Sequence, residues 1–358
     1  MKKLILLSFT FLTLAACSSD DNSKIDPVVP APSSGTVFGS TENPLNVGGA
    51  NQGNQVYIDL SGETALEISR DSWDLGFYSG TTPHVVINGA LGMAVKKLET
   101  TDITQVQVSD ATVAIGTFNA ENMAYVDNPT GDINSTAFGE IASNEASASV
   151  YLVNLGNSVP TQKPDAGSAN VSGTPRGWKK VKVWQDGNGY KLQFAAIDAT
   201  TATTVSIAKD AAYNHTFFNL TTGVTVNVEP QKDKWDLNFT TFTNEVFDGT
   251  GGSAGAYFYA DFVVTNSKAG VTAFKVEGDA NAYAAFTLSD VTSGNYTYST
   301  DQRAIGADWR DVFTHAVYNN VFFVVKDGES NIYKVKFISM VSTEGERGFP
   351  VFQYELLK

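Results

Sequence analysis

Short stretches of alternating apolar and polar residues recur along the chain and are rich in β-branched and aromatic side chains. They span residues 179–184, 190–194, 224–228, 257–264, 321–325, 333–338 and 349–356. Such stretches are typical of β-strands with one buried face. Dipeptides that favour tight turns, such as Asp186-Gly187 and Asp327-Gly328, lie between them. No window has the long 3.6-residue period of an amphipathic helix. The pattern predicts an all-β, antiparallel fold with at most short helical turns.

One ordered set of landmarks occurs twice. Trp73-Asp74-Leu75 is matched by Trp235-Asp236-Leu237, and each is preceded by an apolar strand that ends in Asp59 or Asn219. The offsets are nearly equal, 219 − 59 = 160 and 235 − 73 = 162. An equal order at nearly equal spacing indicates an internal duplication. We therefore predict two tandem domains, residues 53–207 and 208–358, here named the first and second repeats.

Residues 73–77 and 235–239, each named here a tryptophan phrase, have the two-residue period of a β-strand. Trp73, Leu75 and Phe77 alternate with other residues, so they are expected on one buried face, and the second repeat has the same pattern. These side chains are predicted to be core anchors. Asp74 is expected on the opposite face, accepting a hydrogen bond from a turn or a neighbouring strand.

Residues 1–17 have the features of a lipoprotein signal peptide. Lys2 and Lys3 precede a short apolar run, and Leu14-Ala15-Ala16-Cys17 matches the motif at which bacterial lipoproteins are lipidated and cleaved. The apolar run is too short to span a membrane as a stable helix. Cys17 is the only cysteine, so we predict that it carries the lipid and that the mature chain has no disulfide.

The segment after Cys17 indicates where the protein is anchored. Ser18-Ser19-Asp20-Asp21 resembles the acidic tag that sends lipoproteins of the Bacteroidetes to the cell surface, although a periplasm-facing anchor stays open. Residues 18–52 are rich in Pro, Ser, Gly and Asn, which predicts a flexible tether. We expect an outer-membrane protein that contacts the membrane only through its lipid anchor.

Composition and motifs exclude several classes of function. The chain has 24 Lys and Arg against 38 Asp and Glu, a net charge of −14, which argues against a nucleic-acid partner. It has no nucleophile elbow, no paired-histidine metal motif and no phosphate-binding glycine loop that opens a helix. We therefore predict a binding protein and not an enzyme.

The order of landmarks resembles that of the HmuY-like haem-binding lipoproteins (haemophores) of the Bacteroidetes. The second repeat supplies Trp235-Asp236-Leu237, Trp309, Val321-Phe322-Phe323-Val324, Asp327-Gly328 and Lys334-Val335-Lys336-Phe337. The first repeat supplies Trp73-Asp74-Leu75, Asn88-Gly89, Trp178, Asp186-Gly187 and Lys191-Leu192-Gln193-Phe194, and it lacks a clear final aromatic strand. The resemblance covers nearly all of residues 53–358.

The resemblance implies that the protein captures haem and passes it to a TonB-dependent outer-membrane receptor. Family members hold the haem iron between two axial ligands, histidine or methionine, because an imidazole nitrogen or a thioether offers a lone pair to iron. The candidates here are Met123, His315, His84 and Met93. Met123 could instead pack on an apolar surface, and His84 could be a solvated residue at the start of a strand.

Two alternatives to haem capture stay open. The aromatic content of 22 Phe, 14 Tyr and 5 Trp and the lack of an obvious ligand pair are compatible with a surface protein that binds a glycan or a protein partner. In the other alternative, one repeat keeps a ligand site and the other is a structural spacer.

Overall fold

The structure is a computed structural model that describes residues 30–358. The predicted signal peptide, the predicted lipidation site Cys17 and the first part of the predicted tether lie outside the described residues. No helix within residues 30–358 is long and apolar enough to cross a membrane.

Four antiparallel sheets make up residues 37–356, so the predicted all-β class is confirmed. In spatial order, sheet A contains β1 (Val37–Phe38), β20 (Arg347–Leu356), β19 (Ile332–Val341), β18 (Val321–Lys326) and β15 (Thr272–Glu277). Sheet B contains β14 (Ser253–Thr265), β13 (Leu237–Phe247), β2 (Asn54–Asp59) and β3 (Thr64–Ser69). Sheet C contains β12 (Val224–Val226), β11 (His215–Asn219), β4 (Leu75–Tyr78) and β5 (Val85–Ile87). Sheet D contains β10 (Thr203–Ile207), β9 (Gly189–Ala196), β8 (Trp178–Asp186), β7 (Val150–Asn154) and β6 (Ala94–Lys97).

The remaining elements are short, as the sequence predicts. A two-stranded ribbon joins β16 (Arg310–Asp311) to β17 (Ala316–Val317). The α-helices are α1 (Ala280–Ala285) and α2 (Leu288–Ser293). The 3-10 helices are η1 (Gly49–Asn51), η2 (Gly89–Leu91), η3 (Ile103–Gln105), η4 (Ala120–Tyr125), η5 (Glu145–Ser147) and η6 (Ser267–Ala269).

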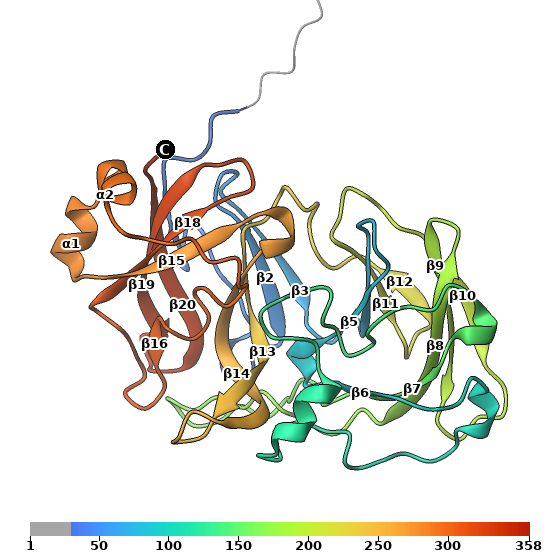
Figure 1. The fold of residues 1–358 in the computed structure, drawn as a ribbon. Coiled ribbons are helices and arrows are strands. Elements are labelled where there is room, and N and C mark those ends of the chain that lie inside the picture. The colour runs from blue at the N-terminus through green and yellow to red at the C-terminus, as the bar shows by residue number, and fades with distance from the viewer. Residues whose placement is uncertain (1–29) are drawn as a thin grey trace, which may run out of the picture. The chain divides into compact units, whose positions relative to one another are not determined.

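The sheets pack as two pairs with separate hydrophobic cores. One core joins sheet A to sheet B and includes Val56, Phe239 and Phe337. The other joins sheet C to sheet D and includes Phe77 and Val181. Sheets B and C meet at a third, smaller cluster, named here the junction cluster, whose buried members are Tyr57, Trp73, Phe217, Val228 and Trp235. In Figure 1, sheets B and C lie between sheets A and D.

The two repeats exchange their first hairpins. The β2–β3 hairpin of the first repeat pairs with β13 of the second repeat, and the β11–β12 hairpin of the second repeat pairs with β4 of the first. Each pairing is completed by the aspartate of the tryptophan phrase. Oδ2 of Asp74 accepts the backbone N–H of Leu220 at 2.7 Å, and Oδ2 of Asp236 accepts that of Leu60 at 2.8 Å. Sheets B and C therefore each contain strands from both sides of the predicted division at residue 207.

The strand face predicted for the tryptophan phrase is correct for Leu and Phe and wrong for Trp. Leu75 and Phe77 lie in the core between sheets C and D, whereas Trp73 lies in the junction cluster. Trp235 is likewise in the junction cluster, apart from Leu237 in the core between sheets A and B. Both tryptophans precede the first residue of their strand, β4 or β13, so the alternation of the strand does not extend to them.

Residues 37–52 differ from the flexible tether that the sequence predicts. β1 pairs with β20, and the ring of Phe38 stacks on that of Phe352 with centroids 5.3 Å apart. Leu45 and Val47 are buried in the same core. The few apolar residues of this segment are ordered because β20 would otherwise be an open sheet edge beside an apolar core.

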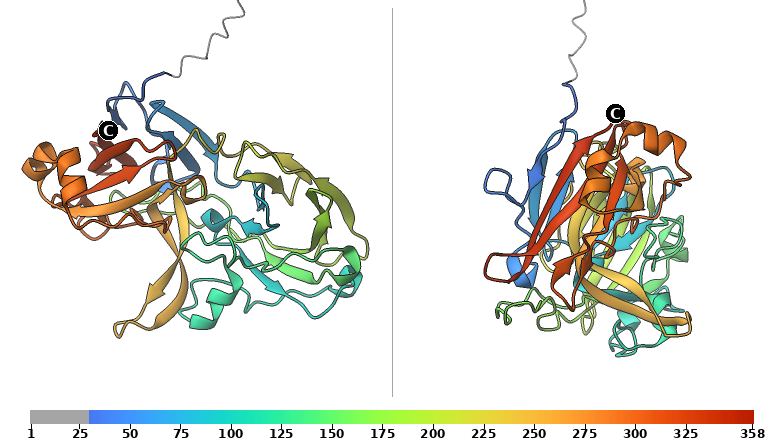
Figure 2. Two further views of the ribbon diagram at one scale, coloured as in Figure 1. Left: turned by 45° about the horizontal axis from the view of Figure 1, so that its top comes forward. Right: turned by 90° about the vertical axis from the view of Figure 1, so that its left-hand side faces the viewer.

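One hairpin extends beyond the sheets. Figure 2 shows the tip of the β13–β14 hairpin projecting from the strands around it. Near this tip the hairpin is held by η4 of the first repeat, because Oδ1 of Asn122 accepts the backbone N–H of Ala256 at 2.6 Å.

Candidate functional site

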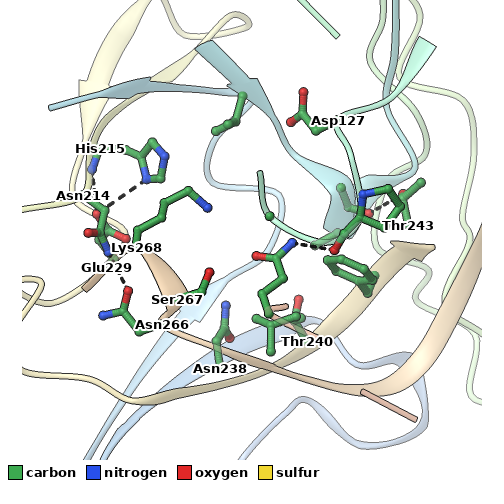
Figure 3. A pocket seen from close by; sticks show the side chains of 18 of the residues that line it. Asp127, Asn214, His215, Glu229, Asn238, Thr240, Thr243, Asn266, Ser267 and Lys268 are labelled. Carbon is green, nitrogen blue, oxygen red and sulfur yellow. Dashed lines mark hydrogen bonds and ion pairs between the residues drawn. The ribbon is translucent and has the colours of Figure 1, made fainter. Parts of the chain in front are cut away.

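A cleft of about 160 Å³ lies beside the junction cluster, where sheets B and C meet. We name it the junction cleft. Its walls come from both repeats, and one side is formed by residues 126–136 of the long first-repeat loop. Figure 3 shows its polar side chains, of which Asp127, Asn214, His215, Glu229, Asn238 and Lys268 recur below.

Aromatic side chains form two opposed parts of the wall. The ring of Trp73 meets that of Phe217 edge-on with centroids 4.7 Å apart, and the ring of Trp235 meets that of Tyr57 in the same way at 5.0 Å. Each pair combines one residue of each repeat, and the two pairs occupy equivalent positions in the duplication. The hairpin exchange therefore brings two copies of one aromatic pair to a single cleft.

A histidine, a carboxylate and an ammonium group line the second-repeat side. The backbone N–H of His215 donates to Oε1 of Glu229 at 2.8 Å, and Nδ1 of the same histidine lies 3.8 Å from that oxygen. Lys268 is partly buried and forms no hydrogen bond or ion pair through its side chain within residues 30–358. Figure 3 shows Lys268 extending from the side of Glu229 toward the middle of the cleft.

Two asparagines fix the turn that presents Lys268. Nδ2 of Asn266 donates to the carbonyl oxygens of Lys232 at 2.9 Å and Trp235 at 3.0 Å. Oδ1 of Asn266 accepts from Nδ2 of Asn214 at 2.9 Å. Asn266 directly precedes η6, so this buried network positions Lys268 within that helix.

Burial controls the charges in the cleft. It lowers the pKa of Lys268, although the carboxylates of Glu229, Asp127 and Asp132 oppose the shift. Burial also lowers the pKa of His215, against the effect of Glu229, so its imidazole is neutral at pH 7. Asp127 accepts backbone N–H groups from Ile87 and Ala137, yet burial raises its pKa to about 6.

Several lining side chains have buried polar atoms without a hydrogen-bond partner among the residues that the structure describes. They are Nε2 of His215, Nε1 of Trp235, Oδ1 of Asn238, Oγ1 of Thr265 and Oγ1 of Thr136. A buried polar atom without a partner typically costs about 1–3 kcal/mol. Such atoms gathered around one cleft indicate a binding site.

The two predicted methionine ligands lie apart from the junction cleft. Met93 is completely buried in the core between sheets C and D, where the surrounding side chains leave no room for haem at its sulfur. Met123 is partly exposed on η4, the helix beside the β13–β14 hairpin.

The two predicted histidine ligands lie in different elements. His84 immediately precedes β5, and both of its ring nitrogens are buried and unpaired among residues 30–358. Burial lowers its pKa, so the ring is neutral at pH 7. His315 lies in the exposed turn between β16 and β17 with φ of 55°. Within the described chain, no hydrogen bond or aromatic contact joins any two of His84, Met93, Met123 and His315.

Reasoning from the sequence does not identify the residues of the junction cleft, His215 among them. The available signal was a difference between equivalent positions of the repeats. With the offset of 160, His215 corresponds to Gln55, since 215 − 160 = 55. Lys268 corresponds to Ala90, because Asn88 and Asn266 make the same bonds to the carbonyl of their tryptophan and each lies two residues earlier. Two positions that are neutral in the first repeat are thus ionisable in the second.

Comparisons with known proteins give one match. The family model described as HmuY protein matches residues 51–208 and again residues 211–354. No curated protein and no solved structure matches the chain. No group of three or more His, Cys, Asp or Glu side chains suited to a metal ion occurs in residues 30–358. The double match covers most of the chain, which therefore belongs to the HmuY protein family.

Proposed function

We propose that this chain is a surface-anchored, non-enzymatic lipoprotein that captures haem for uptake through a TonB-dependent outer-membrane receptor. The observation that carries this proposal is the double match to the HmuY family, which is associated with haem binding. The lipidation motif at Cys17, which lies outside the described residues, supports anchoring at the outer membrane.

Among the four candidate ligands, His84 offers a neutral imidazole without an internal partner, and because both ring nitrogens are buried, iron binding there requires the surrounding side chains to move. Its ring is neutral at pH 7, and neither nitrogen is engaged by another described residue. A free lone pair on a neutral imidazole is what haem iron requires of an axial ligand. Met123 and His315 stay candidates for a second ligand because both are at least partly exposed.

A titration of the purified full-length protein with haemin tests the proposal. We expect a saturable shift of the Soret band and sharp bands after reduction, and we expect His84→Ala to weaken or abolish both. Met123→Ala and His315→Ala, measured separately, identify the second ligand. A featureless response that never saturates would remove haem from the function and leave only the family fold.

A second candidate function is binding of a glycan or another non-haem ligand with haem ligation lost. The observation that favours it is the separation of the predicted ligands, together with the unpaired polar atoms of the junction cleft. In this case haemin gives no saturable spectrum, and the ligand must be sought by the chemistry of the cleft.

A further inference from the structure

On its second-repeat side, the junction cleft has buried polar atoms that lack a partner among residues 30–358 and are free to bind a ligand. In the first repeat, Nε1 of Trp73 donates to Oε1 of Gln55 at 2.9 Å, so this pair is satisfied within the protein. The equivalent pair in the second repeat is Trp235 with His215. There both Nε1 of Trp235 and Nε2 of His215 are buried and have no partner among residues 30–358. The second repeat therefore has no hydrogen bond equivalent to the one between Trp73 and Gln55.

The unpaired atoms include both donors and acceptors. The indole N–H of Trp235 can only donate, and Oδ1 of Asn238 can only accept. The carboxylate of Glu229 near Nδ1 of His215 favours the tautomer with its proton on Nδ1, which leaves Nε2 as an acceptor. A hydroxyl group both donates and accepts, so a ligand with several hydroxyls satisfies such a mixture.

These polar side chains belong to the rigid interior of the cleft. Trp235 is 8% exposed and Asn238 is 5% exposed. Asn238 lies on β13, which is paired with β14 on one side and β2 on the other, so the sheet fixes its backbone position. Preorganised groups of this kind lose little conformational entropy when a ligand binds.

The charges and the aromatic walls restrict the ligand further. Lys268 faces the carboxylates of Glu229, Asp127 and Asp132, so the cleft holds charges of both signs and offers no net positive field to an anion. The same ammonium repels a cationic ligand that comes close to it. The rings of Trp73 and Trp235 offer apolar surface to the C–H groups of a ring-shaped ligand.

We propose that the junction cleft binds a small, neutral, polyhydroxylated ring, namely a single sugar unit, free or at the end of a glycan. Trp235 and Lys268 donate to its hydroxyl oxygens, and Asn238 and His215 accept from its hydroxyl groups. This site specifies the ligand of the second candidate function, and it does not depend on haem capture.

Calorimetric titration of the full-length protein, in a detergent without a sugar head group, tests the inference. The probes are glucose, galactose, mannose and N-acetylglucosamine, with glucuronate and glucosamine as charged analogues. We expect at least one neutral sugar to bind saturably with one site per chain, and both charged analogues to bind at least about tenfold more weakly. We expect Trp235→Phe to weaken binding about tenfold, the usual effect of one lost hydrogen bond to a buried group.

The matched control is Trp309→Phe. Trp309 is also a buried tryptophan with an unpaired Nε1 among residues 30–358, but it lies in the core between sheets A and B and away from the cleft. Its substitution should leave sugar affinity unchanged. Lys268→Met supplies a second test at a partly exposed position, and it too should weaken binding.

Three results would each overturn the inference. They are no binding of any neutral sugar, tighter binding of a charged analogue, or equal effects of Trp235→Phe and Trp309→Phe. A haemin titration of the same Trp235→Phe protein separates the two proposals. If haemin binds and no sugar does, only the sugar site fails, and the opposite result removes only haem capture.

Discussion

Asp127 shows how burial sets the charge of a single residue in the junction cleft. Its pKa rises from 3.8 to about 6 because burial outweighs the two backbone N–H groups that it accepts. The folded chain therefore keeps this proton at pH values where the unfolded chain has lost it. A carboxyl group with a raised pKa makes the free energy of unfolding fall as pH rises between these two values.

The stability of Asp127→Asn should consequently differ from that of the natural chain in a pH-dependent way. We expect the free energy of unfolding of the natural chain, relative to the variant, to fall by about 2–3 kcal/mol between pH 4 and pH 7. Urea unfolding at several pH values measures this difference. A difference that is constant with pH would show that Asp127 ionises normally in the folded protein.

Asp248 provides the control for the sign of this effect. It is exposed in the loop of the β13–β14 hairpin, and hydrogen bonds from Thr250 lower its pKa. Its contribution to stability should be present at neutral pH and be lost as pH falls, opposite to that of Asp127. Asp248→Asn should remove this dependence.

At the scale of elements, we expect the two-residue strand β1 to contribute more to the free energy of unfolding than its length suggests. It covers the edge of sheet A at β20 and places Phe38 in the core, where this side chain is 2% exposed. We expect Phe38→Ala to lower the free energy of unfolding by about 3–5 kcal/mol, because a large buried ring is replaced by a cavity. Chemical denaturation measures the loss.

Phe313→Ala is the matched control because Phe313 is 91% exposed. Its effect on stability should stay within about 0.5 kcal/mol. If Phe38→Ala were as mild as Phe313→Ala, residues 37–52 would be a tether after all, as their composition predicts.

The strands could be predicted from the sequence more completely than their partners. Alternating β-branched and aromatic residues bounded by turns locate strands such as β8, β9, β18 and β19, because burial of one face imposes that period. The partner of each tryptophan-phrase strand could not be predicted. Asp74 and Asp236 each require one backbone N–H, and the two hairpins offer equivalent ones at Leu60 and Leu220. Duplication itself makes the choice ambiguous.

The sequence offers only the difference between equivalent positions of the repeats as a signal for the candidate site, and it does not show that the residues of this site meet. His215, Asn238 and Lys268 are separate in the chain and follow no motif, and only the packing of sheet B beside sheet C brings them to one cleft. Chemical reasoning instead selected histidines and methionines able to bind iron. One of these, Met93, is buried in the core between sheets C and D, where its flexible thioether side chain packs against apolar residues.

At the scale of the whole described chain, the hairpin exchange makes the two repeats one cooperative unit. Residues 32–358 form a single compact unit, and each sheet pair contains a hairpin of the other repeat. We expect a chain cut at a protease site inserted after Asp210, an exposed turn residue, to stay together. Size-exclusion chromatography should give one peak, which separates into two fragments only in denaturant. Two separate fragments under native conditions would contradict the exchange.

The exchange also constrains how the gene can change. A substitution in the β2–β3 hairpin changes its packing and pairing with β13, which is encoded more than 150 codons downstream. A substitution in β11 likewise changes its pairing with β4. Neither half of the gene can drift freely from the other, although each encodes a full set of landmarks. Loss of one half would leave the β4 or β13 strand of the other without the hairpin that pairs with it, so the unit that selection preserves is the pair.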